Sequence, residues 1–130
     1  MFENLKIFSM ASALAQHGAS RQAVVAENIA NADTPGYRAR DLVSFSDAYK
    51  ASPNAGLQAT RPGHHFPGEA RHAAEPREVY RPGAESPNGN TVSIENEIFA
   101  ATEASGDHRK ALAVYKSALT VLRSSINAGR

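Results

Sequence analysis

Apolar residues recur at helical spacing over the first thirty residues of the chain. Steps of three, four and seven residues separate the members of this stripe, which are Ile7, Ala11, Leu14, Gly18, Val25 and Ile29. Asn31 suits a helix C-terminus, and Pro35 pushes Thr34 out of the α region. The pattern therefore predicts a long amphipathic helix that ends near residue 31.

A turn is predicted directly after this helix, at Thr34-Pro35-Gly36-Tyr37. Pro35 sets φ for the second position of a β-turn, and Gly36 supplies the positive φ that a type II turn needs at the third. The chain should bend sharply away from the helix at this point.

The C-terminal third carries a second, longer helical pattern. Its apolar seam alternates steps of four and three, as in a coiled coil, and comprises Ile94, Ile98, Ala101, Ser105, His108, Leu112, Tyr115, Leu119, Leu122 and Ile126. Ser93 is a suitable N-cap, and the acidic residues of this segment precede the basic ones, the order that the helix dipole favours. Gly106 is the weak point, where a bend or break is one alternative to a continuous helix.

Between these patterns lies a middle segment rich in proline and glycine. Six of the seven prolines and five of the nine glycines fall between residues 51 and 90. We expect at most a short β-hairpin there, turning at Asn88-Gly89, with Thr91-Val92 as one strand and Glu78-Val79-Tyr80 as the other. The chain thus divides into a helix with its turn motif (1–49), a flexible middle (50–90) and a C-terminal helix (91–130), which together form one structural unit.

The length of the C-terminal helix predicts that the chain assembles with other subunits. The 33 residues from Ile94 to Ile126 span about 50 Å as an α-helix, whereas a compact chain of this size has a radius of gyration of about 14 Å. The predicted fold is mainly α, with two long terminal helices that can pair antiparallel as a coiled-coil-like rod. Two helices leave part of each apolar stripe uncovered, so neighbouring subunits are the expected cover.

Charge and composition exclude several kinds of partner. The chain has 14 Lys or Arg and 13 Asp or Glu, a net charge of +1, so we expect no nucleic-acid partner. No apolar run approaches the roughly 18 residues of a membrane span. The apolar stretch from Leu5 to Ala15 lacks a preceding basic region, so we expect no cleaved signal peptide.

No constellation of residues indicates catalysis or metal binding. The histidines nearest to a ligand set are His64, His65 and His72, with Glu69, and a loop rich in Pro and Gly does not hold ligands rigidly. No nucleophile elbow or phosphate-binding Gly loop is present. We therefore expect no enzyme, no cofactor and no metal. The arginines of the middle, at 61, 71, 77 and 81, alternate with Glu69, Glu75 and Glu78 and are interpreted as solvated surface.

One motif is more specific. The stretch Asn28-Ile29-Ala30-Asn31-Ala32-Asp33-Thr34-Pro35-Gly36-Tyr37 resembles the N-terminal motif of bacterial flagellar rod and hook proteins, and Arg38 to Leu42 is most similar to a proximal-rod subunit. Residues 88–130 extend the resemblance through Asn88-Gly89-Asn90-Thr91-Val92 and the terminal helix, whereas the middle contributes nothing. Glu27, Asn88 and Ser93 depart from the usual pattern.

The resemblance implies a structural subunit of the flagellar basal-body rod, which transmits torque. It implies that the terminal helices pack into a tubular core and that the turn motif contacts neighbouring subunits. The implied assembly residues of the motif are Asn28, Ile29, Asn31, Thr34, Pro35, Gly36 and Tyr37. Such subunits are exported unfolded through the flagellar type III apparatus and assemble in the periplasm on the membrane-embedded ring and export-gate base. The alternative is a soluble coiled-coil adaptor or export chaperone that uses the C-terminal seam.

Overall fold

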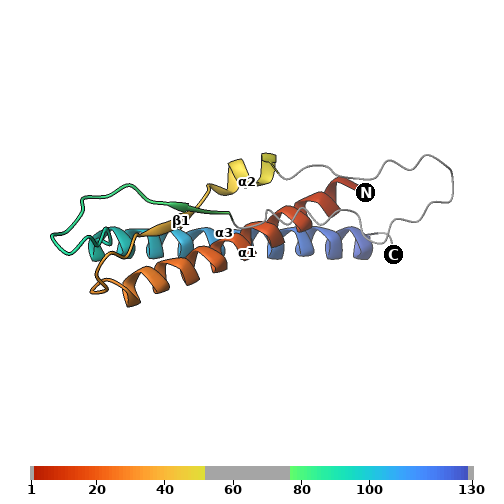
Figure 1. The fold of residues 1–130 in the computed structure, drawn as a ribbon. Helices are drawn as coiled ribbons and strands as arrows, with labels where there is room; N and C mark the ends of the chain where they lie inside the picture. Colours follow the sequence, from red (N-terminus) through yellow and green to blue (C-terminus); the bar gives the residue numbers. More distant parts are fainter. Residues whose placement is uncertain (1, 52–76, 129–130) are drawn as a thin grey trace, which may run out of the picture.

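The computed structural model describes residues 2–51 and 77–128 (Figure 1). Two long helices dominate it, α1 (Phe2–Ala30) and α3 (Ile94–Ala128). Between them come β1 (Arg40–Leu42), α2 (Phe45–Ala51) and β2 (Glu78–Tyr80). The predicted mainly α fold with two long terminal helices is confirmed.

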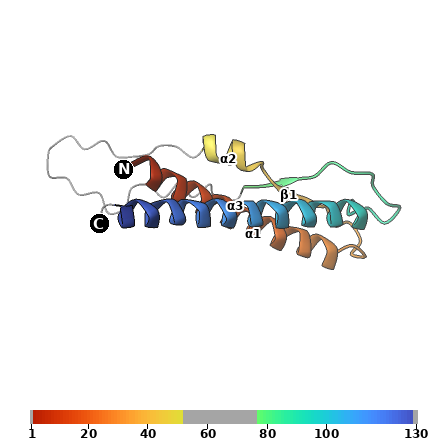
Figure 2. The ribbon, with the colours of Figure 1, turned by 180° about the vertical axis from the view of Figure 1, so that it is seen from behind.

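The two long helices run antiparallel side by side (Figures 1 and 2). Phe8 near the start of α1 packs edge-to-face on Tyr115 of α3, with ring centroids 5.1 Å apart. Near the other end, Asn28 of α1 reaches Glu97 of α3. Both chain ends therefore lie at one end of the molecule, and the turns after α1 and before α3 lie at the other.

Small residues line the contact between the helices. A Cβ added at Gly18 would lie 3.2 Å from the backbone oxygen of Ala104, so the two backbones approach closely there. All but one of the buried apolar residues are alanine or valine, and the exception is Leu42. The others are Ala11, Ala13, Val24, Val25, Ala39, Ala100, Ala104 and Ala111. The core is thin and depends on close approach of the helices.

α3 is one continuous helix. It begins directly after Ser93, whose carbonyl accepts a 3.0 Å bond from the amide of Glu97, as expected for an N-cap residue. It passes Gly106 without interruption, so the sequence alternative of a break at that glycine is wrong. The neighbouring residues Ala104 and His108 contact α1, and this packing holds the helix through the glycine.

A small two-stranded antiparallel sheet differs from the predicted hairpin. Glu78–Tyr80 is a strand, but its partner is Arg40–Leu42, with Asp41 opposite Val79. Asn88-Gly89 instead closes a local turn in which the amide of Ser86 donates to the carbonyl of Asn90. Thr91 binds residues 37 and 39, so it is not free to pair with β2.

β1 and α2 were not predicted, and both lie on one side of the helix pair (Figure 1). Ser44 caps α2, since its hydroxyl accepts a 3.2 Å bond from the amide of Asp47 and donates to the Asp47 carboxylate at 2.8 Å. The ring of Phe45 in α2 lies 5.7 Å from that of His17 in α1. The histidines at 64, 65 and 72 and most of the prolines of the middle segment lie outside the described residues.

Candidate assembly site

The turn of the Asn28–Tyr37 motif is formed as predicted. The amide of Tyr37 donates to the carbonyl of Thr34 at 3.3 Å, and Gly36 has a φ of +72°. Thr34, Pro35 and Gly36 are exposed, as is Ile29 on the last turn of α1. The structure thus presents these four residues to the surroundings at the end of the helix pair.

Asn31 holds the end of the helix. Its Nδ2 donates to the carbonyl of Glu27 at 2.8 Å, and its Oδ1 accepts from the hydroxyl of Thr34 at 3.2 Å. Both contacts are within the motif, so Asn31 stabilises the transition from helix to turn.

Asn28 is fully buried and ties α1 to β1. Its side chain brackets the backbone of Arg40, since Oδ1 accepts from the amide at 3.0 Å and Nδ2 donates to the carbonyl at 2.6 Å. Oδ1 also accepts from the Tyr37 hydroxyl at 3.3 Å, and Nδ2 donates to Glu97 at 3.1 Å. The side-chain amide of Asn28 therefore binds β1 as the backbone of a neighbouring strand would. It does so on the edge of β1 that faces away from β2.

Asn90, which was not among the predicted site residues, completes the motif from the turn that precedes α3. It is 1% exposed, and its Nδ2 lies 2.8–2.9 Å from the carbonyl oxygens of Asn31, Ala32 and Thr34. Its Oδ1 accepts from the amide of Val92 at 2.7 Å. The sequence signals were its place beside Asn88-Gly89 and within the family resemblance at residues 88–92, and neither says what the side chain binds.

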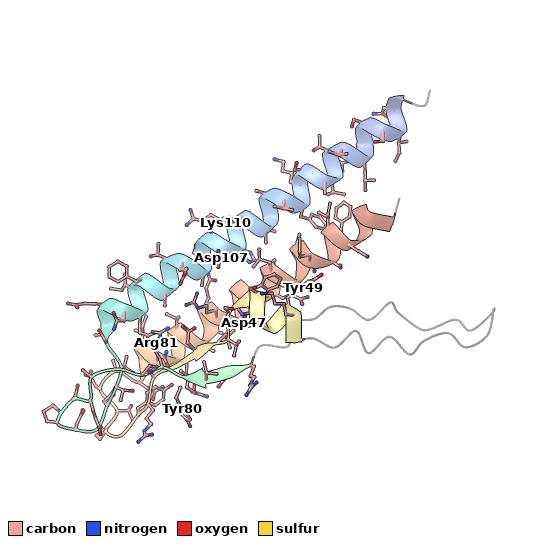
Figure 3. The ribbon with its side chains drawn as sticks, turned by 90° about the horizontal axis from the view of Figure 1, so that it is seen from above. Asp47, Tyr49, Tyr80, Arg81, Asp107 and Lys110 are labelled. Carbon is pink, nitrogen blue, oxygen red and sulfur yellow. The ribbon has the colours of Figure 1, made fainter. Side chains whose placement is uncertain are left out.

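A charge network joins α1, β1, the residue after β2 and α3, and it includes Arg81, which is labelled in Figure 3. Asp41 of β1 accepts from Arg21 of α1 at 2.9 and 3.1 Å and from Arg81, just after β2, at 2.7 Å. Arg81 also donates to Glu97 of α3 at 2.6 Å. Burial raises the pKa of Asp41, but the bonds from Arg21 and Arg81 outweigh it and lower that pKa to about 2.

The prediction that Arg81 is part of a solvated surface is wrong, because Arg81 belongs to this network. Arg81 is half-buried and neutralises Glu97, which is fully buried. Burying a carboxylate requires a paired charge and satisfied oxygens, and Arg81 and Asn28 supply both. The sequence did not reveal Glu97 as the partner of Arg81, because Arg81 is closer in sequence to Glu75 and Glu78, and Glu97 lies in α3.

Glu27, a departure from the usual motif, also has a partner. It pairs with Arg40, whose other amino group donates to Glu78 of β2 at 2.8 Å. Arg40 therefore links α1 to both strands at the surface.

Part of the predicted helix seam lies beside the contact with α1, whereas His108 and Tyr115 of the seam contact α1 directly. The buried positions of α3 are Glu97, Ala100, Ala104 and Ala111, one residue before Ile98, Ala101, Ser105 and Leu112 of the seam. One residue turns the helix by about 100°, so these four seam positions face away from the middle of the contact. Most of its large side chains are exposed in the subunit: Ile94 54%, Ile98 57%, Leu112 51%, Tyr115 41% and Ile126 73%. Leu119 and Leu122 are half-buried.

Two histidines of the described residues bind backbone carbonyls. A ring nitrogen of His17 lies 2.9 Å from the carbonyl oxygen of Val43, and one of His108 lies 3.0 Å from that of Ala15. Within residues 2–51 and 77–128, no group of three His, Cys, Asp or Glu side chains is placed to hold a metal ion. None of the described helices is long and apolar enough to cross a membrane.

The fold and the exposed seam define an elongated helical subunit with apolar surface left for other chains. A family model described as flagella basal body rod protein matches residues 10–38, which include most of α1 and the turn. The flagellar basal body rod protein FlgB of Salmonella typhimurium is 34% identical over 118 residues, 85% of this chain and 86% of that protein. FlgB of Cereibacter sphaeroides is 32% identical and covers 82% of this chain and 83% of its own length. FlgB of Escherichia coli K12 is 40% identical over 61% of this chain and 62% of its own length.

The chain belongs to the flagellar basal body rod protein family. It is a structural subunit of the flagellar rod, a component that assembles with other rod subunits. The relatives favour this function over a soluble adaptor or export chaperone.

Proposed function

We propose that this chain is a subunit of the proximal part of the rod and forms, with other rod subunits and further copies of itself, a tubular axial structure that transmits torque. The subunit is exported without a cleaved signal peptide and assembles in the periplasm on the membrane ring and export-gate base. The observation that carries the proposal is the exposed apolar seam of α3, at Ile94, Ile98 and Leu112, in a helix pair whose buried polar side chains have hydrogen-bond partners. Such a seam is typical of a surface that a neighbouring subunit covers.

The Asn28–Tyr37 motif has two roles in this proposal. Asn28, Asn31 and Tyr37 hold the turn through bonds within the subunit. Ile29, Thr34, Pro35 and Gly36 are exposed and contact neighbouring subunits. The bonded residues thus position the exposed ones.

The test places carboxylates on the exposed seam. Ile98→Asp/Leu112→Asp changes side chains that are more than half exposed, so the free subunit should fold and be exported as before. In the assembled rod, each carboxylate would be buried without a partner, which costs several kcal/mol. We expect a normal exported pool and at least about a tenfold loss of incorporation into isolated basal bodies.

The matched control is Thr102→Asp/Thr120→Asp, which adds two carboxylates at exposed polar positions of the same helix. It should leave incorporation much closer to that of the unmodified chain. Equal incorporation of the seam variant and the unmodified chain would show that the seam faces solvent in the rod and would refute the proposal.

A further inference from the structure

Charge is separated along the long axis of the molecule. The level where Gly18 lies against Ala104 and His108 divides the helix pair into two halves. The loop half, residues 19–41 and 77–107, contains nine acidic and five basic residues. The chain-end half, residues 2–18 and 108–128, contains five basic residues and one acidic residue, and α2 carries one of each sign. With histidine neutral, the halves have net charges of −4 and +4.

Much of this charge is free to act outside the subunit. In the loop half, the acidic Asp33, Glu85 and Glu95 and the basic Arg38 and Arg77 are exposed and form no ion pair with another described residue, so acidic groups are in the majority. In the chain-end half, Lys6, Lys116 and Arg123 are likewise exposed and without an ion pair to any described residue. The buried and half-buried charges Arg21, Asp41, Arg81 and Glu97, by contrast, neutralise one another.

Each half also carries exposed apolar side chains. In the loop half, Ile94, Ile98 and Phe99 are 54%, 57% and 75% exposed. In the chain-end half, Leu112, Val121 and Ile126 are 51%, 54% and 73% exposed. Each half therefore offers apolar surface for burial, and the two halves differ in the sign of their charge.

We propose that a second copy of this chain binds head to tail, with the acidic loop half of one copy lying along the basic chain-end half of the next. Opposite charges then face each other across the contact, whereas contacts between like halves repel. A head-to-tail contact uses two different surfaces and continues from copy to copy in one direction, unlike a two-fold dimer. The net charge of +1 adds little general repulsion between copies. This proposal rests on the proposed function and names the neighbour and its orientation.

The first experiment measures self-association of the purified full-length chain by sedimentation at rising salt. Salt shortens the screening length from about 30 Å at 0.01 M to about 10 Å at 0.1 M, so association should weaken as salt is added. Two variants then raise the net charge by the same amount but at different places. They distinguish an effect of charge position from an effect of net charge. Glu85→Gln/Glu95→Gln removes negative charge from the loop half, and Ser117→Lys/Thr120→Lys adds positive charge to the chain-end half.

We expect opposite effects from these two variants. The loop-half variant should associate about tenfold more weakly at low salt, and the chain-end variant more tightly than the unmodified chain. If both weaken association equally, net charge alone acts and the proposal is wrong. A chain that remains monomeric at low salt would also overturn it.

The second experiment tests orientation. Because the chain has no cysteine, single cysteines report contacts cleanly. Asn96→Cys marks the loop half and Ser117→Cys the chain-end half, both at exposed positions. Treatment with a bifunctional maleimide should link the two variants to each other in a mixture several-fold more than it links either variant to itself. Preferential linking of like halves would contradict the head-to-tail arrangement.

Failure of this proposal is distinguishable from failure of the proposed function. Basal bodies that incorporate the chain, together with charge variants that associate alike, would leave the rod function intact and remove the head-to-tail contact. Absence of the chain from isolated basal bodies would instead refute the proposed function, whatever the charge variants do in solution.

Discussion

At the scale of single residues, Asn90 connects the turn before α3 to the turn after α1. Its side-chain amide has two hydrogens but faces three carbonyl oxygens, those of Asn31, Ala32 and Thr34, so at least one bond is shared. These carbonyls belong to the turn directly after α1, and those of Asn31 and Thr34 also accept backbone bonds, from the amides of Thr34 and Tyr37. Asn90 supplies a further donor from a residue far along the sequence, so the turn is completed only when the segment before α3 is folded against it.

Replacing Asn90 tests this role. Asn90→Ala should lower the free energy of unfolding by about 2–3 kcal/mol, because three carbonyls of the turn lose a donor and the amide of Val92 loses its acceptor. Urea unfolding followed by circular dichroism measures the change. Asn96→Ala, at an exposed position of α3, is the control and should change stability by less than about 0.5 kcal/mol. Equal effects of the two substitutions would show that the end of α1 does not depend on Asn90.

At the scale of elements, the packing of α1 on α3 depends on how closely the two helix backbones approach each other. Gly18 and Gly106 are both inside helices, but only Gly18 faces the partner helix. A Cβ at Gly18 would lie 3.2–3.3 Å from atoms of Ala104 and His108, whereas a Cβ at Gly106 would meet nothing within 4 Å. Replacing each glycine with alanine therefore distinguishes the effect of helix propensity on stability from the effect of packing against the partner helix.

Alanine at these two glycines should give different results. Gly106→Ala should raise the free energy of unfolding by about 1 kcal/mol, since alanine favours the helix and the site is open. Gly18→Ala should gain less or destabilise, because Ala104 and His108 must move to admit the methyl group. Thermal unfolding of both variants measures the difference. If Gly18→Ala stabilised as much as Gly106→Ala, the helices would not be in close contact at that level.

The elements differ in how far the sequence predicts them. The long helices were predictable because an apolar stripe continues over many turns, and the turn at Gly36 was predictable because Pro-Gly selects a backbone conformation. β1 is three residues long and contains Arg40 and Asp41, so it has no apolar alternation to detect. Its pairing depends on Asn28 and on the charge network, contacts between segments far apart in sequence.

The arrangement of the proposed assembly residues could be predicted only in part for the same reason. The exposed seam follows from its spacing, but the division of the motif into bonded and exposed residues does not. Asn28 and Ile29 are neighbours in sequence, and only the packing of α1 against β1 and α3 buries the first while the second stays 42% exposed.

At the scale of the whole molecule, buried contacts are concentrated away from the chain ends. The fully buried side chains of Val25, Asn28, Asn90 and Glu97 all lie in the loop half, where the charge network also joins α1, β1, the residue after β2 and α3. In α3, the last buried residue is Ala111, and most side chains from there to Asn127 are exposed. The structure thus has a stable half and a half that depends more on neighbours.

Hydrogen exchange on the free subunit tests this gradient. Amides of residues 97–111 should exchange slowly, since opening them would break the buried bonds of Glu97 and the contact at Gly18. Amides of residues 113–127 should exchange at least about tenfold faster, because helices of this length with an uncovered apolar face are marginal in water. Uniform protection along α3 in a verified monomer would contradict the gradient. In isolated basal bodies the difference should shrink, since neighbouring subunits would cover Val121 and Ile126 and hold the last turns of α3 in place.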